Sequence, residues 1–303
     1  MKFTTVFSAL TLPFLVSAQA QGLYSKDLNV FELDTTNFNQ VVMESNQTTI
    51  VEFYAPWCGH CRQLKPHYSK AAKQLKDIVQ VGAVNCDYAK NKNLCSKYKI
   101  EGYPTIMGFR PPKVNLDKVE NLKYTHATEK YSGARTAKGI VDFGLGRIKN
   151  YVKRIATEDK LNEWLNKSSP RPKTVVFTRK DKLAPLLKSI AIDLLGIVDI
   201  AYFPLRDREV GIFEKYDIDP KGDKAVVFYF DSKTNEPIRN TSGLSKLELF
   251  KFYQQFNEIQ SQLDEVLEKS EYLNKVQKGE KITKKSKKNG KKSKSDTLDH
   301  DEL

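Results

Sequence analysis

Apolar residues along the chain gather in short continuous runs, and longer stretches with a helical spacing of apolar positions lie between them. This alternation of strand and helix patterns predicts an α/β fold. In the first half of the chain the pattern predicts strands at 30–33, 50–54, 79–84, 105–109 and 130–132, and helices at 37–44, 58–76, 93–98 and 137–152. The charged segment 110–128 is long for a strand connection and is expected to form a surface excursion.

The pattern begins again after Arg154. It predicts helices at 158–165, 183–195, 210–216 and 246–267, and strands at 174–178, 197–202, 225–230 and 237–239. The length between the two ends of the chain suits two domains of ordinary size. We therefore expect two tandem α/β domains, at 21–154 and 155–267, each with a central mixed sheet flanked by helices.

The two ends of the chain carry targeting patterns. Lys2 precedes the apolar stretch 7–16, and small residues follow, which predicts a secretory signal peptide at 1–20 rather than a buried helix. Residues 300–303 read His-Asp-Glu-Leu, the form of tetrapeptide that the retrieval receptor of the endoplasmic reticulum binds. Together they predict a protein of the lumen of that compartment, where disulfides persist, without a membrane span.

The net charge of +13 is concentrated near the C-terminus. The segment 278–294 consists mainly of lysine, serine and glycine, which cannot bury a core, so we expect 268–303 to be a flexible tail that presents the retrieval signal. A lumenal location excludes nucleic acid as a partner. Three N-x-S/T sequons predict glycosylation in surface loops, at Asn46, Asn166 and Asn240.

A CxxC motif follows the predicted strand 50–54 and opens the predicted helix 58–76. A thiolate at a helix N-terminus faces unpaired backbone N–H groups and the positive end of the helix dipole, which lower its pKa. Cys58 is therefore expected to attack disulfides, and Cys61 to close the motif disulfide. The alternative is a permanent structural disulfide, which an exposed small ring does not favour.

Glu52 interrupts an otherwise apolar strand. Burial of a carboxyl group raises its pKa and costs free energy unless a partner or water compensates. We therefore expect a functional role for this side chain. The alternative is an edge strand from which Glu52 faces solvent.

Residues 51–61 read Val-Glu-Phe-Tyr-Ala-Pro-Trp-Cys-Gly-His-Cys, and 102–105 read Gly-Tyr-Pro-Thr. In this order and spacing, the two segments resemble the catalytic thioredoxin-like domain of the protein disulfide-isomerase family. The second half resembles the non-catalytic thioredoxin-like domains of that family in element order and length. The resemblance implies two tandem thioredoxin-like domains, one of them active.

The resemblance also implies roles within the motif. Cys58 forms the mixed disulfide with the substrate, and Cys61 resolves it. Gly59 and His60 lie between them, and His60 favours the thiolate of Cys58. Glu52 matches the buried acid that exchanges a proton with the resolving cysteine.

Further residues are assigned by the same resemblance. Arg135 matches an arginine that stabilises the thiolate of the resolving cysteine, although on the sequence alone it reads as a surface side chain. Pro104 is expected to follow a cis peptide bond beside the cysteines. Tyr103 and Trp57 are expected to contact extended substrate chains, although either residue could simply pack. Ala83 stands where the family has a lysine that pairs with the buried acid, so Glu52 is expected to rely on water.

Cys86 and Cys95 are expected to form a structural disulfide, since some family members carry a similar second pair. The alternative, a zinc site of four cysteines, requires two CxxC-like spacings, which this chain lacks. No cofactor other than the redox-active disulfide is expected.

These patterns lead to one functional expectation and one alternative. The first is an endoplasmic reticulum protein disulfide-isomerase that acts on unfolded secretory proteins, with a thiol oxidase or glutathione as redox partner. The alternative is a chaperone, or an adaptor for a calnexin-type lectin chaperone, whose redox activity is secondary. The second half supports the alternative, since it has no cysteine and Lys224 stands at the position of Pro104.

Overall fold

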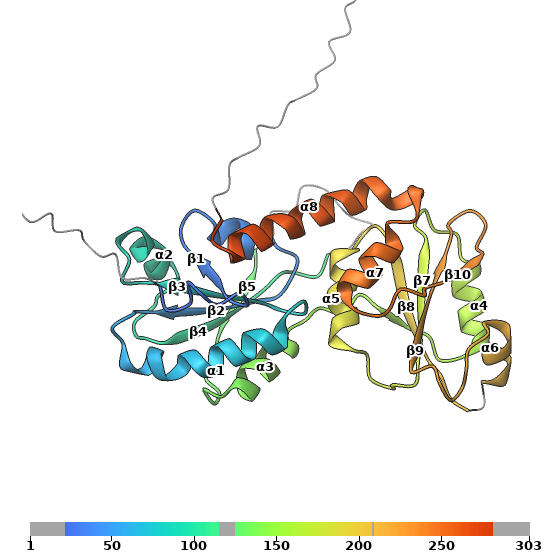
Figure 1. Cartoon of the computed structure of the whole chain (residues 1–303), viewed down its shortest axis with the longest axis horizontal. Helices are drawn as coiled ribbons and strands as arrows, with labels where there is room; N and C mark the ends of the chain where they lie inside the picture. Colours follow the sequence, from blue (N-terminus) through green and yellow to red (C-terminus); the bar gives the residue numbers. More distant parts are fainter. Residues whose placement is uncertain (1–21, 115–124, 208, 281–303) are drawn as a thin grey trace, which may run out of the picture.

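The computed structural model of the protein describes residues 22–114, 125–207 and 209–280 (Figure 1). The predicted signal peptide, the retrieval tetrapeptide and part of the predicted surface excursion lie outside the described residues. The described chain forms two mixed five-stranded sheets with helices on both faces. The predicted fold class, two tandem α/β domains with central mixed sheets, is confirmed.

The first sheet has the strand order β1-β3-β2-β4-β5. Its strands are β1 (Phe31–Leu33), β2 (Thr49–Tyr54), β3 (Gln80–Asn85), β4 (Thr105–Arg110) and β5 (Ala127–Lys130). One face packs against α1 (Gly59–Leu75) and α3 (Ala137–Leu145). The other face packs against a short π-helix (Asn39–Met43) and α2 (Lys92–Lys97). All six residues of β2 are buried, which is expected for a central strand covered on both faces.

The second sheet has the order β6-β8-β7-β9-β10, which repeats the order of the first. Its strands are β6 (Lys153–Arg154), β7 (Lys173–Thr178), β8 (Asp199–Pro204), β9 (Ala225–Phe230) and β10 (Pro237–Arg239). The helices α5 (Pro185–Asp193) and α7 (Lys246–Tyr253) cover one face. The helices α4 (Glu158–Asn166) and α6 (Val210–Lys215) cover the other.

Two predicted elements at the end of the first domain differ from the structure. The helix predicted at 137–152 ends at Leu145, because Gly144 and Gly146 disfavour helix and the chain then leaves the first domain. Val152 already packs in the core of the second domain, and β6 pairs with β8. The second domain therefore begins before 155. The edge strand predicted at 130–132 lies at β5 instead.

The predicted closing helix 246–267 is two helices. After α7 the chain turns through a 3₁₀ segment and continues as α8 (Gln260–Gln277). This helix passes the predicted boundary at 267 and returns to the first domain, as Figure 1 shows. The expectation of a flexible tail from 268 is therefore wrong for 268–277, because α8 buries Val276 in the first domain's core.

Candidate active site

The CxxC motif lies where β2 turns into α1. Cys58 is the N-cap residue of α1, with extended backbone angles of φ −70° and ψ 119°. Its backbone N–H donates to the carbonyl of Ala55 at 3.0 Å, which closes the turn. Cys58 is partly exposed, Cys61 is fully buried, and both are free thiols in this structure.

The two thiols of the motif have opposite pKa shifts. Desolvation raises the pKa of Cys58, but hydrogen bonds from the Cys61 backbone and thiol and from the His60 backbone outweigh it and lower the pKa below its ordinary value. For Cys61, desolvation together with the nearby Glu52 and Cys58 raises the pKa to about 12. The partly exposed thiol thus has the lower pKa, which favours its thiolate, and the buried thiol needs a proton acceptor to ionise near neutral pH.

The loop before β4 lies against the motif. The peptide bond between Tyr103 and Pro104 is cis. The Sγ of Cys58 donates to the carbonyl oxygen of Tyr103 at 3.6 Å. Arg135 precedes α3, is exposed, and donates to the carbonyl oxygen of Pro104 at 3.4 Å. The structure therefore brings these predicted residues, distant in sequence, to the cysteine pair.

Two aromatic side chains border Cys58. The rings of Trp57 and Tyr103 meet edge to face, with centroids 6.1 Å apart. The side chain of Trp57 is 63% exposed, while its Nε1 donates to Oδ1 of Asp87 at 3.0 Å. Asp87 was not among the residues predicted from the sequence; it lies two residues after β3, the strand that pairs with β2. His60 and Gly59 are exposed at the first turn of α1.

Glu52 is fully buried in the middle of the sheet, between Ala83 on β3 and Ile106 on β4. The Tyr24 hydroxyl donates to its Oε2. Its Oε1 has no hydrogen-bond partner among the described residues. The alternative of an edge strand is therefore wrong. The expectation that Glu52 relies on water did not include the hydrogen bond from Tyr24.

Burial dominates the pKa of Glu52. Desolvation raises it, and the nearby Glu32 raises it further, whereas the hydrogen bond from Tyr24 and the positive charge of Arg135 lower it. The net pKa is about 8. A carboxyl group with this pKa next to a buried thiol can exchange protons near neutral pH.

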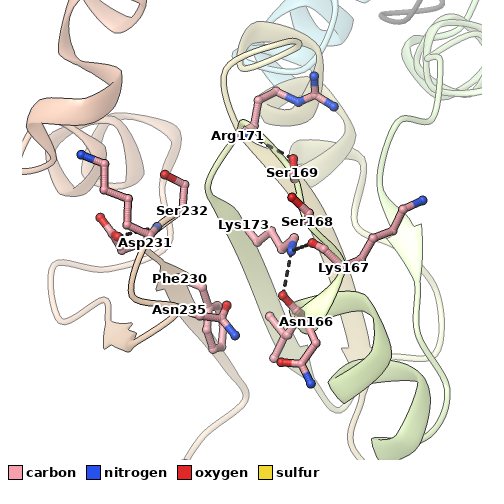
Figure 2. Close-up of a pocket in the computed structure, with 12 residues that line it drawn as sticks. Asn166, Lys167, Ser168, Ser169, Arg171, Lys173, Phe230, Asp231, Ser232 and Asn235 are labelled. Carbon is pink, nitrogen blue, oxygen red and sulfur yellow. Dashed lines mark hydrogen bonds between the residues drawn. The ribbon is translucent and has the colours of Figure 1, made fainter.

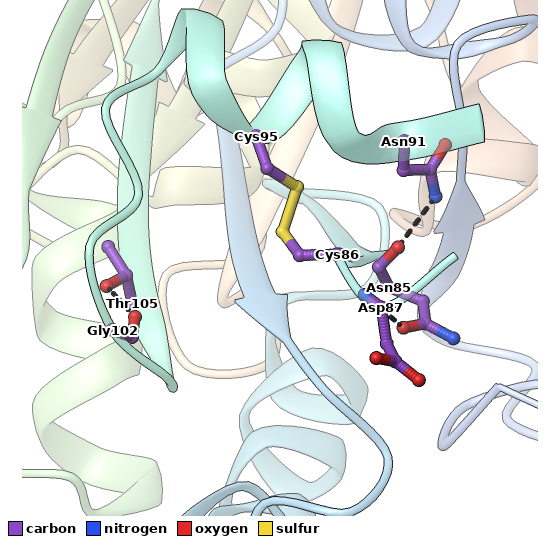
Figure 3. The surroundings of a disulfide bond; sticks show 7 residues. All are labelled: Asn85, Cys86, Asp87, Asn91, Cys95, Gly102 and Thr105. Atoms are coloured by element: carbon purple, nitrogen blue, oxygen red, sulfur yellow. Dashed lines mark hydrogen bonds between the residues drawn. A yellow bond between two sulfur atoms is a disulfide. The ribbon is translucent and has the colours of Figure 1, made fainter. Parts of the chain in front are cut away.

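The second cysteine pair forms a disulfide at the end of β3 (Figure 3). Cys86 and Cys95 are joined by an S–S bond of 1.97 Å, with Cα atoms 6.0 Å apart. The bond ties α2 to the sheet. It uses two of the four thiols that a four-cysteine zinc site would need, so that alternative is wrong for this form of the protein.

Among its described residues, the second domain has no counterpart of this site. In the strand register, Val176 of β7 occupies the position that Glu52 has in β2. The same register places Ala225, rather than the expected Lys224, at the position of Pro104. A polar cavity of about 240 Å³ lies at one end of this sheet (Figure 2). At its wall, Nζ of Lys173 donates to the carbonyl oxygens of Leu165 and Lys167, at 2.7 and 2.5 Å. Lys173 thus binds backbone carbonyl groups at the C-terminal end of α4, within its own domain.

The three sequons differ in accessibility. Asn46 and Asn166 are exposed. Asn240 is only 9% exposed; its side chain donates to the carbonyl of Gly243 at 2.6 Å and accepts from the backbone N–H of Ser242 at 3.0 Å. The amide of Asn240 therefore holds a turn together in the folded chain, and a glycan at this residue stays a prediction. Glycans at Asn46 and Asn166 stay predictions as well.

Known proteins are similar to this chain in sequence and in fold. A family model described as Thioredoxin matches residues 29–143. The protein disulfide-isomerase MPD1 of Saccharomyces cerevisiae is 41% identical over 255 residues, 82% of this chain and 79% of the yeast protein. A putative protein disulfide-isomerase of Dictyostelium discoideum is 34% identical over 238 residues, 78% of this chain and 54% of that protein.

A solved structure supports the fold alone. A crystal structure of ERdj5, form II, superposes with a TM-score of 0.52 at 20% identity and covers 77% of this chain and 30% of its own. Within 22–114, 125–207 and 209–280, no helix combines the length and apolarity needed to cross a bilayer. The yeast relative, aligned over most of both chains, and the geometry of the cysteine pair together show that the chain belongs to the protein disulfide-isomerase family and is a thiol-disulfide oxidoreductase.

Proposed function

We propose that this oxidoreductase forms and rearranges disulfides of folding secretory proteins in the lumen of the endoplasmic reticulum. The observation that carries the proposal is the pair of thiols at the start of α1, with Cys58 accessible at a lowered pKa and Cys61 buried at a raised one. The apolar N-terminal stretch and the His-Asp-Glu-Leu ending support the location and a retrieval receptor as a partner.

The first step is attack on a substrate disulfide. The Cys58 thiolate attacks one sulfur, so a Cys58–substrate disulfide forms while the substrate disulfide breaks. The other substrate sulfur leaves as a thiolate. Trp57 and Tyr103 supply an apolar surface beside the reacting sulfur for an extended substrate segment.

The second step resolves the mixed disulfide. The thiol of Cys61 passes its proton to the Glu52 carboxylate, and the Cys61 thiolate attacks Sγ of Cys58. A Cys58–Cys61 disulfide forms, and the remaining substrate sulfur leaves as a thiolate. The substrate gains two electrons, which the motif loses. Arg135 favours this step, since its positive charge stabilises thiolate and carboxylate near it.

The reverse sequence oxidises a substrate dithiol. A thiol oxidase of the compartment or glutathione disulfide returns the motif to its disulfide form, so no dissociable cofactor takes part. The second domain, without thiol chemistry, serves to bind unfolded chains or a partner such as a calnexin-type lectin chaperone. Loss of co-purification with that partner after deletion of the second domain is the test of this docking.

The refolding of a reduced multi-disulfide protein in glutathione buffer tests the main proposal. The chain from residue 21 onward should accelerate the return of activity, and Cys58→Ser should abolish the acceleration. Cys61→Ser should accumulate a disulfide-linked complex with the substrate, visible on a non-reducing gel. Acceleration that survives Cys58→Ser would contradict the proposal and favour a chaperone whose redox pair is secondary.

A further inference from the structure

The carboxyl group of Glu52 lacks a charged partner on the neighbouring strands. Its cross-strand neighbours, Ala83 and Ile106, offer no side-chain hydrogen bond. A buried carboxylate without a partner carries a large desolvation cost. Among the described residues, the Tyr24 hydroxyl is the group that donates a hydrogen bond to its side chain. The oxygen Oε1 has none.

Tyr24 is itself held in place from several sides. Its side chain is 1% exposed, and its ring packs edge-on against Tyr54 at 5.7 Å and tilted against Tyr68 at 5.5 Å. Its backbone N–H donates to Oε1 of Glu32 on β1 at 2.8 Å. The Tyr54 hydroxyl donates to the same oxygen at 3.0 Å. These contacts fix the direction in which the Tyr24 hydroxyl points, so it is a preorganised donor rather than a mobile one.

We propose that Tyr24 is the positioning residue for Glu52: its hydroxyl holds Oε2 and stabilises the carboxylate, which leaves Oε1 as the acceptor of the Cys61 proton. This inference rests on the proposed resolving step. Donation to one oxygen removes rotational freedom from the carboxyl group and favours its ionised form. In this chain the neutral hydroxyl of Tyr24, from the segment before β1, thus stabilises the Glu52 carboxylate, for which the neighbouring strands provide no side-chain partner.

The ionisable groups around the pair are consistent with this direction of the hydrogen bond. Desolvation and the nearby Glu52 raise the pKa of Tyr24 far above its ordinary value, so the tyrosine keeps its proton and donates. Glu32 on β1 opposes ionisation of Glu52, and Arg135 favours it. The thiols Cys58 and Cys61 on α1 and the hydroxyls of Tyr54 and Tyr68 complete the titratable neighbours.

The test is Tyr24→Phe, which keeps the packed ring and removes the donor. The resolving step is followed as the release of glutathione from a Cys58–glutathione mixed disulfide, across a range of pH. The loss of a hydrogen bond to a charged group should raise the pKa of Glu52, so release at pH 7 should slow by roughly tenfold and recover as the pH rises. Carboxyl-carbon NMR of Glu52 measures the same rise without turnover.

Tyr68→Phe is the matched control, since it keeps the ring that packs against Tyr24 and removes a buried hydroxyl that bonds the backbone carbonyls of Ile50 and Gly82 rather than Glu32 or Glu52. It should not slow release at pH 7 in this way. In a Glu52→Gln background, Tyr24→Phe should cause no further loss. An unchanged Glu52 titration in Tyr24→Phe, or an equal loss at every pH, would overturn the inference. No glutathione release by the unmodified protein would instead sink the proposed function.

Discussion

The two cysteines of the active site are one helical turn apart but lie in different environments. Cys58 lies at the N-terminus of α1 with a lowered pKa, and Cys61 lies inside with a pKa of about 12. We expect iodoacetamide to alkylate Cys58 at neutral pH faster than glutathione is alkylated, and to leave Cys61 unmodified. Peptide mass spectrometry over a pH series measures both rates. Alkylation of the two thiols at equal rates would contradict the assigned roles.

The raised pKa of Glu52 has a consequence for stability. In the unfolded chain this carboxyl loses its proton near pH 4.3, whereas the folded protein retains it up to about pH 8. The folded state thus binds more protons in this window, so the free energy of unfolding falls by about 1.4 kcal/mol for each pH unit through it. Glu52→Gln should remove this fall in the free energy of unfolding between about pH 4.3 and about pH 8.

Chemical unfolding at pH 5 and pH 8 measures the effect. The variant should gain stability relative to the unmodified protein at pH 8, by a few kcal/mol, and little at pH 5. Glu44→Gln, at an exposed residue, is the control and should change neither value. An equal effect of Glu52→Gln at both pH values would show that its carboxyl is not the group that titrates.

At this scale the sequence predicted the residues that lie within motifs, and missed those that only the fold brings near. Cys58, Cys61 and Pro104 belong to segments with a recognisable local pattern. Tyr24 reaches Glu52 across 28 positions, and Asp87 reaches Trp57 across 30. Neither has a local pattern, because its role depends on the order of strands in the sheet.

Individual elements followed their apolar pattern closely where a sheet covers them, and less closely where tertiary contacts interrupt a helix. The predicted helix 246–267 breaks because Phe256 stacks on Tyr229 of β9, with ring centroids 3.7 Å apart. Glu258 then accepts from Oγ of Ser232 at 2.6 Å. The two partner residues lie on β9 and in the loop that follows it. The apolar spacing within 246–267 therefore could not predict the break.

The disulfide between β3 and α2 stabilises the first domain. Closing a loop this short lowers the entropy of the unfolded chain by the equivalent of about 2 to 3 kcal/mol. Replacement of Cys86 and Cys95 by alanine should lower the free energy of unfolding by that amount, as chemical unfolding measures. Disulfide exchange with substrate should persist, since these cysteines lie outside the redox motif.

Replacement of Cys58 and Cys61 by alanine is the complementary experiment. It should abolish disulfide exchange and leave the contribution of the Cys86–Cys95 bond to stability intact. If replacement of Cys86 and Cys95 also stopped exchange in a protein that remains folded, the second pair would have a redox role rather than a structural one.

In the whole molecule, α8 joins the two domains at both of its ends. Leu263 is fully buried in the core of the second domain, and Val276 packs in the core of the first. Between them, Nζ of Lys269 donates to the carbonyl oxygen of Glu44 at 3.0 Å. A second contact between the domains is made by the Gln47 side chain, which donates to the carbonyl of Ser189 in α5 at 3.0 Å. The catalytic domain is therefore held against its inactive partner rather than only tethered to it.

Val276→Asp should release the C-terminal half of α8 from the first domain. A charge placed among apolar side chains costs more than the packing it replaces, so the helix should detach from 268 onward while Leu263 stays anchored. Hydrogen exchange followed by mass spectrometry should show faster exchange in 268–277 and in β1. Asn274→Asp adds the same charge on an exposed position of the same turn, and its exchange should match that of the unmodified protein. Equal protection in Val276→Asp would mean that the other contacts alone hold α8 against the first domain.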